Sequence, residues 1–456
     1  MDAIPEAVSG TAGMTPHTGV EAPRIGETRR YRGRSRIDVV ARRLYLVAFL
    51  MRAVAGIGGY IATEYFDIPL LQDALYYEEV GHSVALEWLS GESSQWLDTE
   101  RYGGKIAWLM VATIGGLYFL LQGYRSVPLL LILWSALTAW VPVYTYRIGL
   151  ELGAPPAVSR RAAWLVALLP AFVFWSGALY KEGLVLLVLS IGVYHALRLQ
   201  RRWSAGSLLA IILSVVVLFG LRFYLAPLLG GAMVLGLIFA RDKGASKGRL
   251  GAGVVMLARQ TTLALLFIIA MVSMGLTERA EESLFETQAG LLVQLDSSRR
   301  DLSSAESGYL PGADISAPEE VVRFFPVGLL YFLTVPFPWQ LGGLRQTLTI
   351  PETLAWVLAY PLVLVGIVRG FRVNRSGTAF LVMLTAAMCC VYAVLSGNVG
   401  TAYRMRTQVW LFWALFAVWG WEVWRRPTPE RDELGTGLRR ASVRRQSVTT
   451  DAKGRT

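Results

Sequence analysis

Long, continuous apolar runs separated by polar segments occupy most of the chain between residues 43 and 424. Each run extends over about 16–25 residues, the length that an α-helix needs to cross the hydrocarbon core of a bilayer. The runs do not alternate in the way that a membrane β-barrel requires. The pattern therefore predicts an all-α, polytopic transmembrane helical bundle of about 10–12 spans. The expected spans are 43–63, 106–124, 127–146, 161–179, 183–198, 205–221, 225–240, 253–276, 352–369, 377–396 and 407–424.

The polar segments divide the chain into regions. Both ends are polar and basic, and they are predicted to be disordered. The expected regions are a head at 1–42, an N-terminal transmembrane module at 43–276 with an external loop at 64–105, an external region at 277–351, C-terminal transmembrane helices at 352–424, and a tail at 425–456. Within the external region, the apolar piece 324–339 contains three prolines and is predicted to be re-entrant or interfacial.

The distribution of charge predicts the orientation in the membrane. The loop 64–105 holds nine acids against Arg101 and Lys105, and residues 277–325 hold ten acids against four arginines. The short loops between other spans are rich in arginine and lysine, so we expect them, and both termini, on the cytoplasmic side of the inner membrane. This orientation requires an odd number of crossings between residues 106 and 150, where the pattern shows two apolar runs.

Composition excludes several classes of protein. The net charge of +11 arises in the tails and short loops, as the positive-inside rule expects, so it does not indicate nucleic-acid binding. Cys389 and Cys390 are adjacent within an apolar run and predict neither a disulfide nor a metal site. The three histidines are scattered without the spacing of metal ligands. The chain contains no GxxxxGK[ST] motif, so it does not hydrolyse nucleotides by that route.

The first external loop predicts an amphipathic helix lying along the membrane interface. Its apolar positions Leu75, Val80, Val84 and Trp88 recur at near-helical spacing, with charged residues between them. Asp73 is placed at the expected N-cap of this helix. Two interpretations stay open: Asp73 caps the helix, or it acts as a general base above a membrane-level cavity.

Opposite charges meet at the expected outer end of a span in the stretch WSGALYKEGLVLLVLS. Lys181 and Glu182 form either an interfacial ion pair of little energetic value or part of a functional site, because charge at membrane depth is costly. Arg222 lies beside Tyr224 at another outer turn, in FGLRFYLAPLL. The charged residues near membrane level therefore gather on one side.

Two further arginines precede the last span, in SGNVGTAYRMRTQ. Arg404 and Arg406 follow Tyr403 there, and both could simply extend their charges toward water. Positive charge on the outer side nevertheless opposes the topological bias, and guanidinium groups bind phosphate well. Cations facing a carboxylate suggest group transfer, in which the carboxylate takes a proton from a hydroxyl and the cations hold a departing phosphate.

Four stretches together resemble the GT-C superfamily of membrane glycosyltransferases, which includes protein mannosyltransferases and lipid A aminoarabinose transferases. They are the D..YY of Asp73, Tyr76 and Tyr77, the sequence LLPAFVFWS....KEGL, the sequence LRFY, and GTAYRMR before the final span. The resemblance covers most of residues 43–424. It implies transfer of a sugar, with inversion, from a polyprenyl-phosphate or pyrophosphate donor on the external face.

The resemblance assigns expected roles to particular residues. Asp73 corresponds to the first-loop carboxylate, and Lys181 with Glu182 to the second outer-loop position, which makes Asp73 and Glu182 the catalytic candidates. Many relatives carry an acidic pair in the first loop, whereas Ala74 follows Asp73 here, so use of a divalent cation stays open. The residues expected to bind the substrate and lipid phosphate are Lys181, Arg222, Tyr224, Tyr403, Arg404 and Arg406.

The expected function is transfer of a sugar to an envelope glycan, lipid or protein, with the module 43–276 as the catalytic part. Its partners would be the lipid-linked donor and membrane lipid. One alternative is an oligosaccharide ligase or polymerase that uses the same arginines and the large loop 277–325. Another is a polysaccharide or lipid transporter, against which the sequence shows no clear inverted repeat. The oligomeric state is open.

Overall fold

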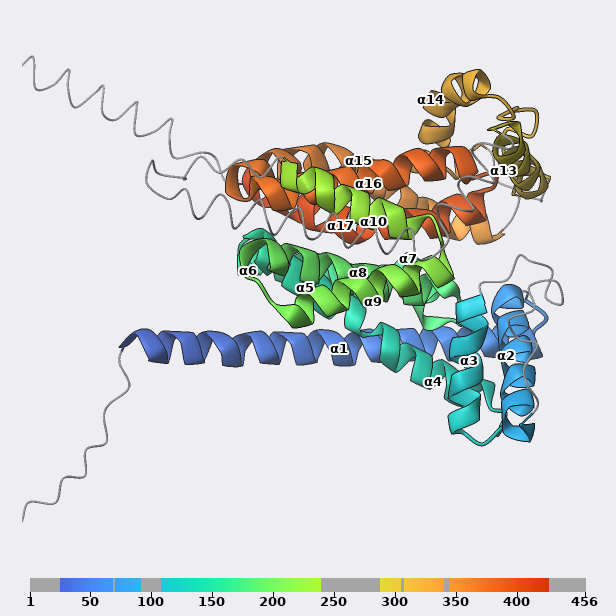
Figure 1. Ribbon diagram of the computed structural model, residues 1–456, viewed down its shortest axis with the longest axis horizontal. Helices are drawn as coiled ribbons and strands as arrows, with labels where there is room; N and C mark the ends of the chain where they lie inside the picture. Colours follow the sequence, from blue (N-terminus) through green and yellow to red (C-terminus); the bar gives the residue numbers. More distant parts are fainter. Residues whose placement is uncertain are drawn as a thin grey trace, which may run out of the picture. The chain divides into compact units, whose positions relative to one another are not determined.

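The computed structural model describes residues 25–68, 70–91, 108–238, 288–304, 307–339 and 344–425, and these are helical apart from short connections and one isolated bridge between Gly308 and Asn398. The predicted all-α fold is therefore confirmed. The helices (Figure 1) are α1 Ile25–Tyr65, α2 Gln72–Ser90, α3 Trp108–Leu120, α4 Val127–Thr138, α5 Trp140–Leu152, α6 Pro156–Leu168, α7 Pro170–Gly177, α8 Lys181–Arg201, α9 Ala205–Leu221, α10 Leu225–Ile238, α13 Gln288–Ser303, α14 Pro318–Thr334, α15 Leu344–Val373, α16 Arg375–Leu395 and α17 Val399–Arg425.

Several helices are long and apolar enough to cross a membrane, so the chain is a multi-pass membrane protein. Within the described residues, the helical segments that meet this test are Val39–Tyr65, Val127–Leu152, Lys181–Arg201, Gln346–Val373 and Arg375–Leu395. The bent pair α6 and α7 adds a sixth if it is counted as one span. This number is smaller than the predicted 10–12 for three reasons: α3, α9 and α10 are apolar but short, α17, which contains the expected span 407–424, is not among the helices that meet the test, and the expected span 253–276 lies outside the described residues.

The region between residues 106 and 150, where the sequence shows two apolar runs but the orientation requires an odd number of crossings, contains one long helical segment and one short one. Helices α4 and α5 together form the segment Val127–Leu152, which is long enough to span. Helix α3 has 13 residues, about 20 Å of helix against a hydrocarbon core of about 30 Å. Counting one crossing here agrees with the odd number that the charge distribution requires.

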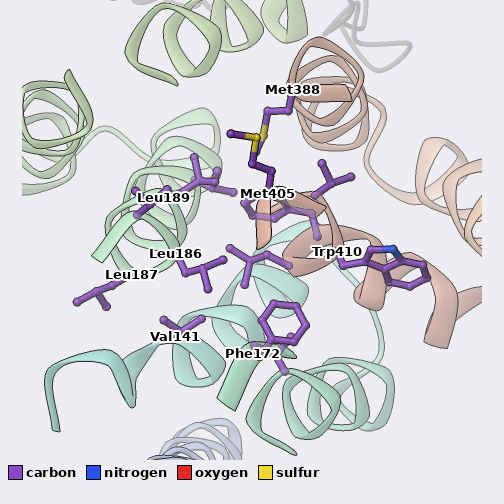
Figure 2. Close-up of a cluster of buried hydrophobic side chains, with 14 of the residues drawn as sticks. Val141, Phe172, Leu186, Leu187, Leu189, Met388, Met405 and Trp410 are labelled. Carbon is purple, nitrogen blue, oxygen red and sulfur yellow. The ribbon is translucent and has the colours of Figure 1, made fainter. Parts of the chain in front are cut away.

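Helix α8 runs through the centre of the bundle, and 72% of its apolar 18-residue stretch is buried. It packs on α5 and α9, while α15 packs along α17 and α10 lies against α16. Figure 2 shows part of the apolar core between the helices, with Leu186 and Leu189 of α8 near Phe172 of α7 and Met405 of α17. The outward faces are also apolar, since Leu358 on α15 is 69% exposed, which suits contact with lipid.

The predicted amphipathic helix of the first loop is present as α2, and α3 packs along it. One of the charged residues between its apolar positions, Glu78, lies on the inward face. Glu78 is buried, and its carboxylate accepts hydrogen bonds from the Tyr118 hydroxyl at 2.6 Å and from Arg125 at 2.7 and 3.0 Å. This buried cluster fixes α2 on α3, because a buried carboxylate is stable only when it is paired and hydrogen-bonded.

The polar and apolar regions of the sequence can be compared with the helices. Within the segment 324–339, α14 continues through Pro326 and ends at Thr334, before Pro336 and Pro338; its re-entrant or interfacial placement stays a prediction. The head was expected to be disordered up to residue 42, whereas α1 begins at Ile25; residues 1–24 and the tail from 426 lie outside the described residues.

The contact between α15 and α17 depends on glycine. A Cβ atom on Gly366 would lie 1.9 Å from the backbone oxygen of Phe416, and one on Gly420 would lie 1.9 Å from that of Leu362. Distances this short cannot be tolerated, so a larger residue at either position must move the helix backbones apart.

We expect Gly366→Ala to lower the free energy of unfolding by about 1–3 kcal/mol or more, because backbone cannot yield as a side chain can. Thermal unfolding of the purified protein in detergent measures the effect. Gly58→Ala in α1 is the matched control, since a Cβ there meets nothing within 4 Å and alanine favours the helix. Equal stability of the two variants would contradict the close packing of α15 on α17.

Candidate functional site

Asp73 lies in the first turn of α2, with its side chain 66% exposed. The prediction that it occupies the N-cap is wrong, because the N-cap is Leu71 and no side chain caps the helix there. The Leu71 backbone N–H instead donates to the Thr63 hydroxyl of α1 at 3.2 Å. The carboxylate of Asp73 is therefore not used in capping and can contact groups outside its own helix.

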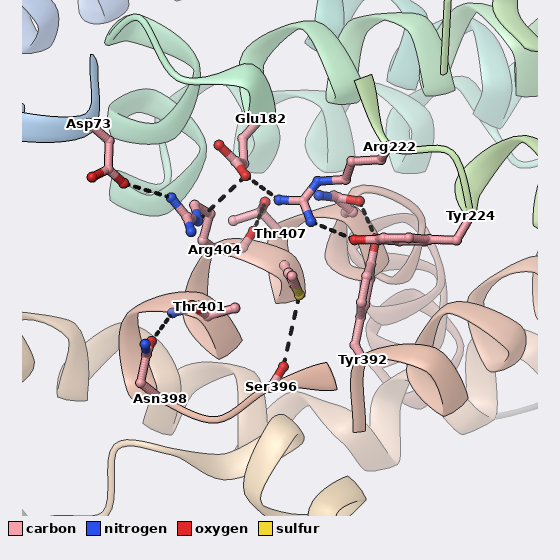
Figure 3. A network of polar contacts seen from close by, with 12 residues as sticks. Asp73, Glu182, Arg222, Tyr224, Tyr392, Ser396, Asn398, Thr401, Arg404 and Thr407 are labelled. Atoms are coloured by element: carbon pink, nitrogen blue, oxygen red, sulfur yellow. Dashed lines mark hydrogen bonds and ion pairs between the residues drawn. The ribbon is translucent and has the colours of Figure 1, made fainter. Parts of the chain in front are cut away.

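Arg404 connects Asp73 to two other elements near the start of α17. Its Nη1 lies 3.5 Å from Oδ2 of Asp73, and its Nε lies 3.5 Å from Oε1 of Glu182. Its guanidinium also stands over the Trp175 ring of α7, 5.7 Å from the ring centroid. Figure 3 shows the row of side chains that results, running from Asp73 through Arg404 to Glu182 and Arg222. Residues 331 positions apart in the sequence therefore meet, as the sequence-based hypothesis required.

Glu182 is fully buried at the start of α8, where it binds two guanidinium groups. Arg222, which follows α9, donates from Nη2 to Oε1 of Glu182, and its Nη1 donates to the Tyr224 hydroxyl at 2.5 Å. The other carboxylate oxygen of Glu182 has no hydrogen-bond partner among the described residues. Glu182 therefore differs from Asp73, since it is enclosed and paired while Asp73 is open to solvent.

Lys181 adds a third cation to this cluster. Its ammonium group interacts electrostatically with Arg222, Glu182, Arg404 and Asp73. Three cationic side chains against two carboxylates leave the cluster with one formal positive charge. Arg404 lies 3.5 Å from each of the two carboxylates, whereas Arg222 is bound closely to Glu182, so Arg404 and Lys181 are the groups best able to receive an anion.

Aromatic residues near this cluster include three that the sequence analysis did not select as site residues. Trp175 faces Arg404, and Tyr180 packs edge-on against Trp175 while its hydroxyl donates to the Leu70 carbonyl at 2.8 Å, just before α2. Burial first, and then the negative charge of Glu182, raise the pKa of Tyr77, so its phenol remains a hydrogen-bond donor at neutral pH. The sequence could have indicated these three aromatic residues by their position, because they lie in the stretches around Asp73 and Lys181 that the sequence analysis singles out.

Two of the predicted phosphate-binding residues have other partners. Arg406 is fully buried, and it donates to the backbone carbonyls of Phe332 at 2.8 Å and Val335 at 2.7 Å, at the end of α14. The Tyr403 hydroxyl donates to Oε2 of Glu352 at 2.7 Å. These two side chains stabilise contacts between helices, and the charged row of Figure 3 is built without them.

Potential metal ligands do not cluster in the described part of the chain, where no group of three or more His, Cys, Asp or Glu side chains could hold an ion. Asp73 and Glu182 are both bound to Arg404, an arrangement that satisfies carboxylates with guanidinium groups.

The fold and the charged row define a multi-pass helical membrane protein with a polar cluster at one end of several helices. A comparison with models of protein families finds no match to this chain, and a search of curated proteins finds none either.

Proposed function

We propose that this chain is a membrane glycosyltransferase that moves a sugar from a polyprenyl-phosphate or pyrophosphate donor to an envelope glycan, lipid or protein. The observation that supports this most directly is the bridging position of Arg404 between the exposed carboxylate of Asp73 and the buried carboxylate of Glu182. A solvent-exposed base next to a loosely held cation is the arrangement that inverting transfer from a phosphate leaving group requires.

The proposed step uses each charged group differently. Asp73 accepts the proton of the acceptor hydroxyl, whose oxygen forms a bond to the anomeric carbon of the donor sugar. The bond between that carbon and the phosphate oxygen breaks, and the phosphate departs with the electron pair. Arg404 and Lys181 stabilise the negative charge on the leaving phosphate.

Glu182 and Arg222 have supporting roles in this proposal. Glu182 is enclosed by two guanidinium groups, so it orients Arg404 and does not remove a proton itself. Arg222 neutralises Glu182 and in turn contacts the Tyr224 hydroxyl. The cluster would lie at the external face of the inner membrane, with both termini in the cytoplasm, as the charge distribution of the loops suggests.

Binding of a prenyl phosphate tests the proposal directly. We expect Arg404→Ala to weaken the binding of farnesyl phosphate to the detergent-solubilised protein by about tenfold or more, because a charge-assisted hydrogen bond is lost. Microscale binding titrations measure the dissociation constant.

Arg323→Ala provides the matched control, since Arg323 is 74% exposed and, within the part of the chain that the structure describes, pairs with Glu320 of its own helix. This control should bind farnesyl phosphate as the wild type does. If Arg404→Ala also keeps the wild-type dissociation constant, Arg404 does not bind the donor phosphate and the proposal loses its main support.

A further inference from the structure

The apolar segment formed by α6 and α7 is broken just before the candidate site. The two helices are bent by 58° at Leu169, and Pro170 begins α7. Because proline has no backbone N–H, the Val166 carbonyl loses the hydrogen-bond partner that a continuous helix would supply at position 170. The first N–H groups of α7 also lack partners within the helix. A break of this kind inside a membrane protein requires other groups to satisfy the backbone.

Arg52 of α1 satisfies one side of the break. This arginine is fully buried, and it donates to the Val166 carbonyl at 3.5 Å and to the Ser176 hydroxyl at 2.7 Å. Helix α1 approaches α7 closely at this level, since a Cβ on Gly177 would lie 2.5 Å from the Arg52 backbone oxygen. Arg52 therefore binds the last turn of α6 and the last turn of α7 together.

Glu352 of α15 satisfies the other side of the break. Its Oε2 accepts a hydrogen bond from the Ala171 N–H at 3.0 Å, at the start of α7, and one from the Tyr403 hydroxyl at 2.7 Å. Glu352 is 8% exposed, and burying a carboxylate in an apolar region costs free energy. A negative charge at a helix N-terminus also interacts favourably with the helix dipole. Through Tyr403, the same carboxylate holds the turn of α17 that carries Arg404.

Helix α7 has eight residues and ends four positions before Lys181. It carries Trp175, which faces Arg404, and the chain after it turns directly into the Lys181–Glu182 pair. We propose that Glu352 and Arg52 are positioning residues that fix the half-helix α7 from opposite sides and so set where Trp175 and the start of α8 meet Arg404. This inference rests on the proposed function, in that Arg404 is taken as the group that binds the donor phosphate.

The experiment compares three variants of the full chain by two measurements. Glu352→Leu removes the acceptor, Glu352→Gln keeps an oxygen for the Ala171 N–H or the Tyr403 hydroxyl, and Tyr360→Phe is the matched control. Tyr360 lies on the same helix and donates to the Leu333 carbonyl at 2.6 Å, so its loss removes a hydrogen bond of α15 that does not involve α7. The first measurement is hydrogen–deuterium exchange of residues 170–180 without ligand, and the second is the dissociation constant of farnesyl phosphate.

We expect Glu352→Leu to speed amide exchange in residues 170–180 and to weaken farnesyl phosphate binding by about tenfold, because small misplacements of binding groups are costly. Glu352→Gln should restore most of both properties, and Tyr360→Phe should match the wild type. If Glu352→Leu does not fold, Tyr403→Phe is used; it frees α17 from Glu352 and should weaken binding by about threefold.

Unchanged exchange in Glu352→Leu, unchanged binding in the variant that folds, or an equal loss in Tyr360→Phe would each overturn the positioning role. A wrong proposed function gives a different result from a wrong positioning role, because the wild-type protein would then not bind farnesyl phosphate at all. The exchange measurement, which needs no ligand, would still decide whether Glu352 holds α7.

Discussion

Replacing Asp73 with asparagine is expected to slow sugar transfer by about 10²- to 10⁴-fold, the range by which general-base catalysis accelerates such steps. The physical reason is that the amide cannot accept the proton of the acceptor hydroxyl, although it has nearly the same shape. Because Arg404 and Lys181 are unchanged, farnesyl phosphate should still bind. The rate is measured as release of farnesyl phosphate from a panel of hexoses and pentoses linked to farnesyl phosphate.

Asp67→Asn is the control for the loss of one acid from the first loop. Asp67 is exposed and has a φ of 57°, a left-handed conformation that asparagine also adopts readily. This variant should transfer sugar at the wild-type rate. Wild-type transfer by Asp73→Asn would remove the base from the mechanism, and movement of labelled lipid across vesicles without any transfer would favour a transporter.

Arg222→Met is expected to have the largest effect on stability. The substitution removes the closest ion pair of the fully buried carboxylate of Glu182, which keeps the longer contact to Arg404 and the electrostatic interaction with Lys181. Breaking a buried ion pair from one side costs about 3–5 kcal/mol, because the remaining charge stays out of water without adequate compensation. Unfolding of the purified protein in detergent, by heat or denaturant, reports this loss.

The double variant Arg222→Met with Glu182→Leu tests that explanation, because it removes both charges and should recover most of the lost stability. Arg161→Met is the comparison for an exposed pair: Arg161, about half exposed, binds Glu422, and its loss should cost at most about 1 kcal/mol. An Arg222→Met protein as stable as Arg161→Met would show that the buried pair contributes little.

The sequence predicted part of the candidate site because that part depends on local signals. Asp73 was selected from its place at the start of an amphipathic helix, and the Lys181–Glu182 pair from its place at the end of an apolar run. Both lie at helix starts in the structure, in α2 and α8. Their common location with Arg222 and Arg404 is a prediction of the topology, and the ion pairs that join Asp73, Arg404, Glu182 and Arg222 agree with it.

The sequence could not distinguish Arg404 from Arg406. Residues two apart on an α-helix point about 200° apart around its axis, since each residue advances about 100°. Arg404 thus reaches Asp73 and Glu182, while Arg406 reaches the carbonyls at the end of α14. Which of the two faces the charged row depends on the rotation of α17 in the bundle, which only packing against other helices sets.

By itself, the sequence determined that this protein is a helical membrane protein, because long apolar runs leave helices as the way to satisfy the backbone in lipid. It also determined where polar groups collect along the chain. Only the tertiary structure decided which buried charges stabilise it: Glu78 with Arg125, Arg52 at the break before α7, and Glu352 at its start. These contacts join residues 47 to 181 positions apart, so no local pattern encodes them.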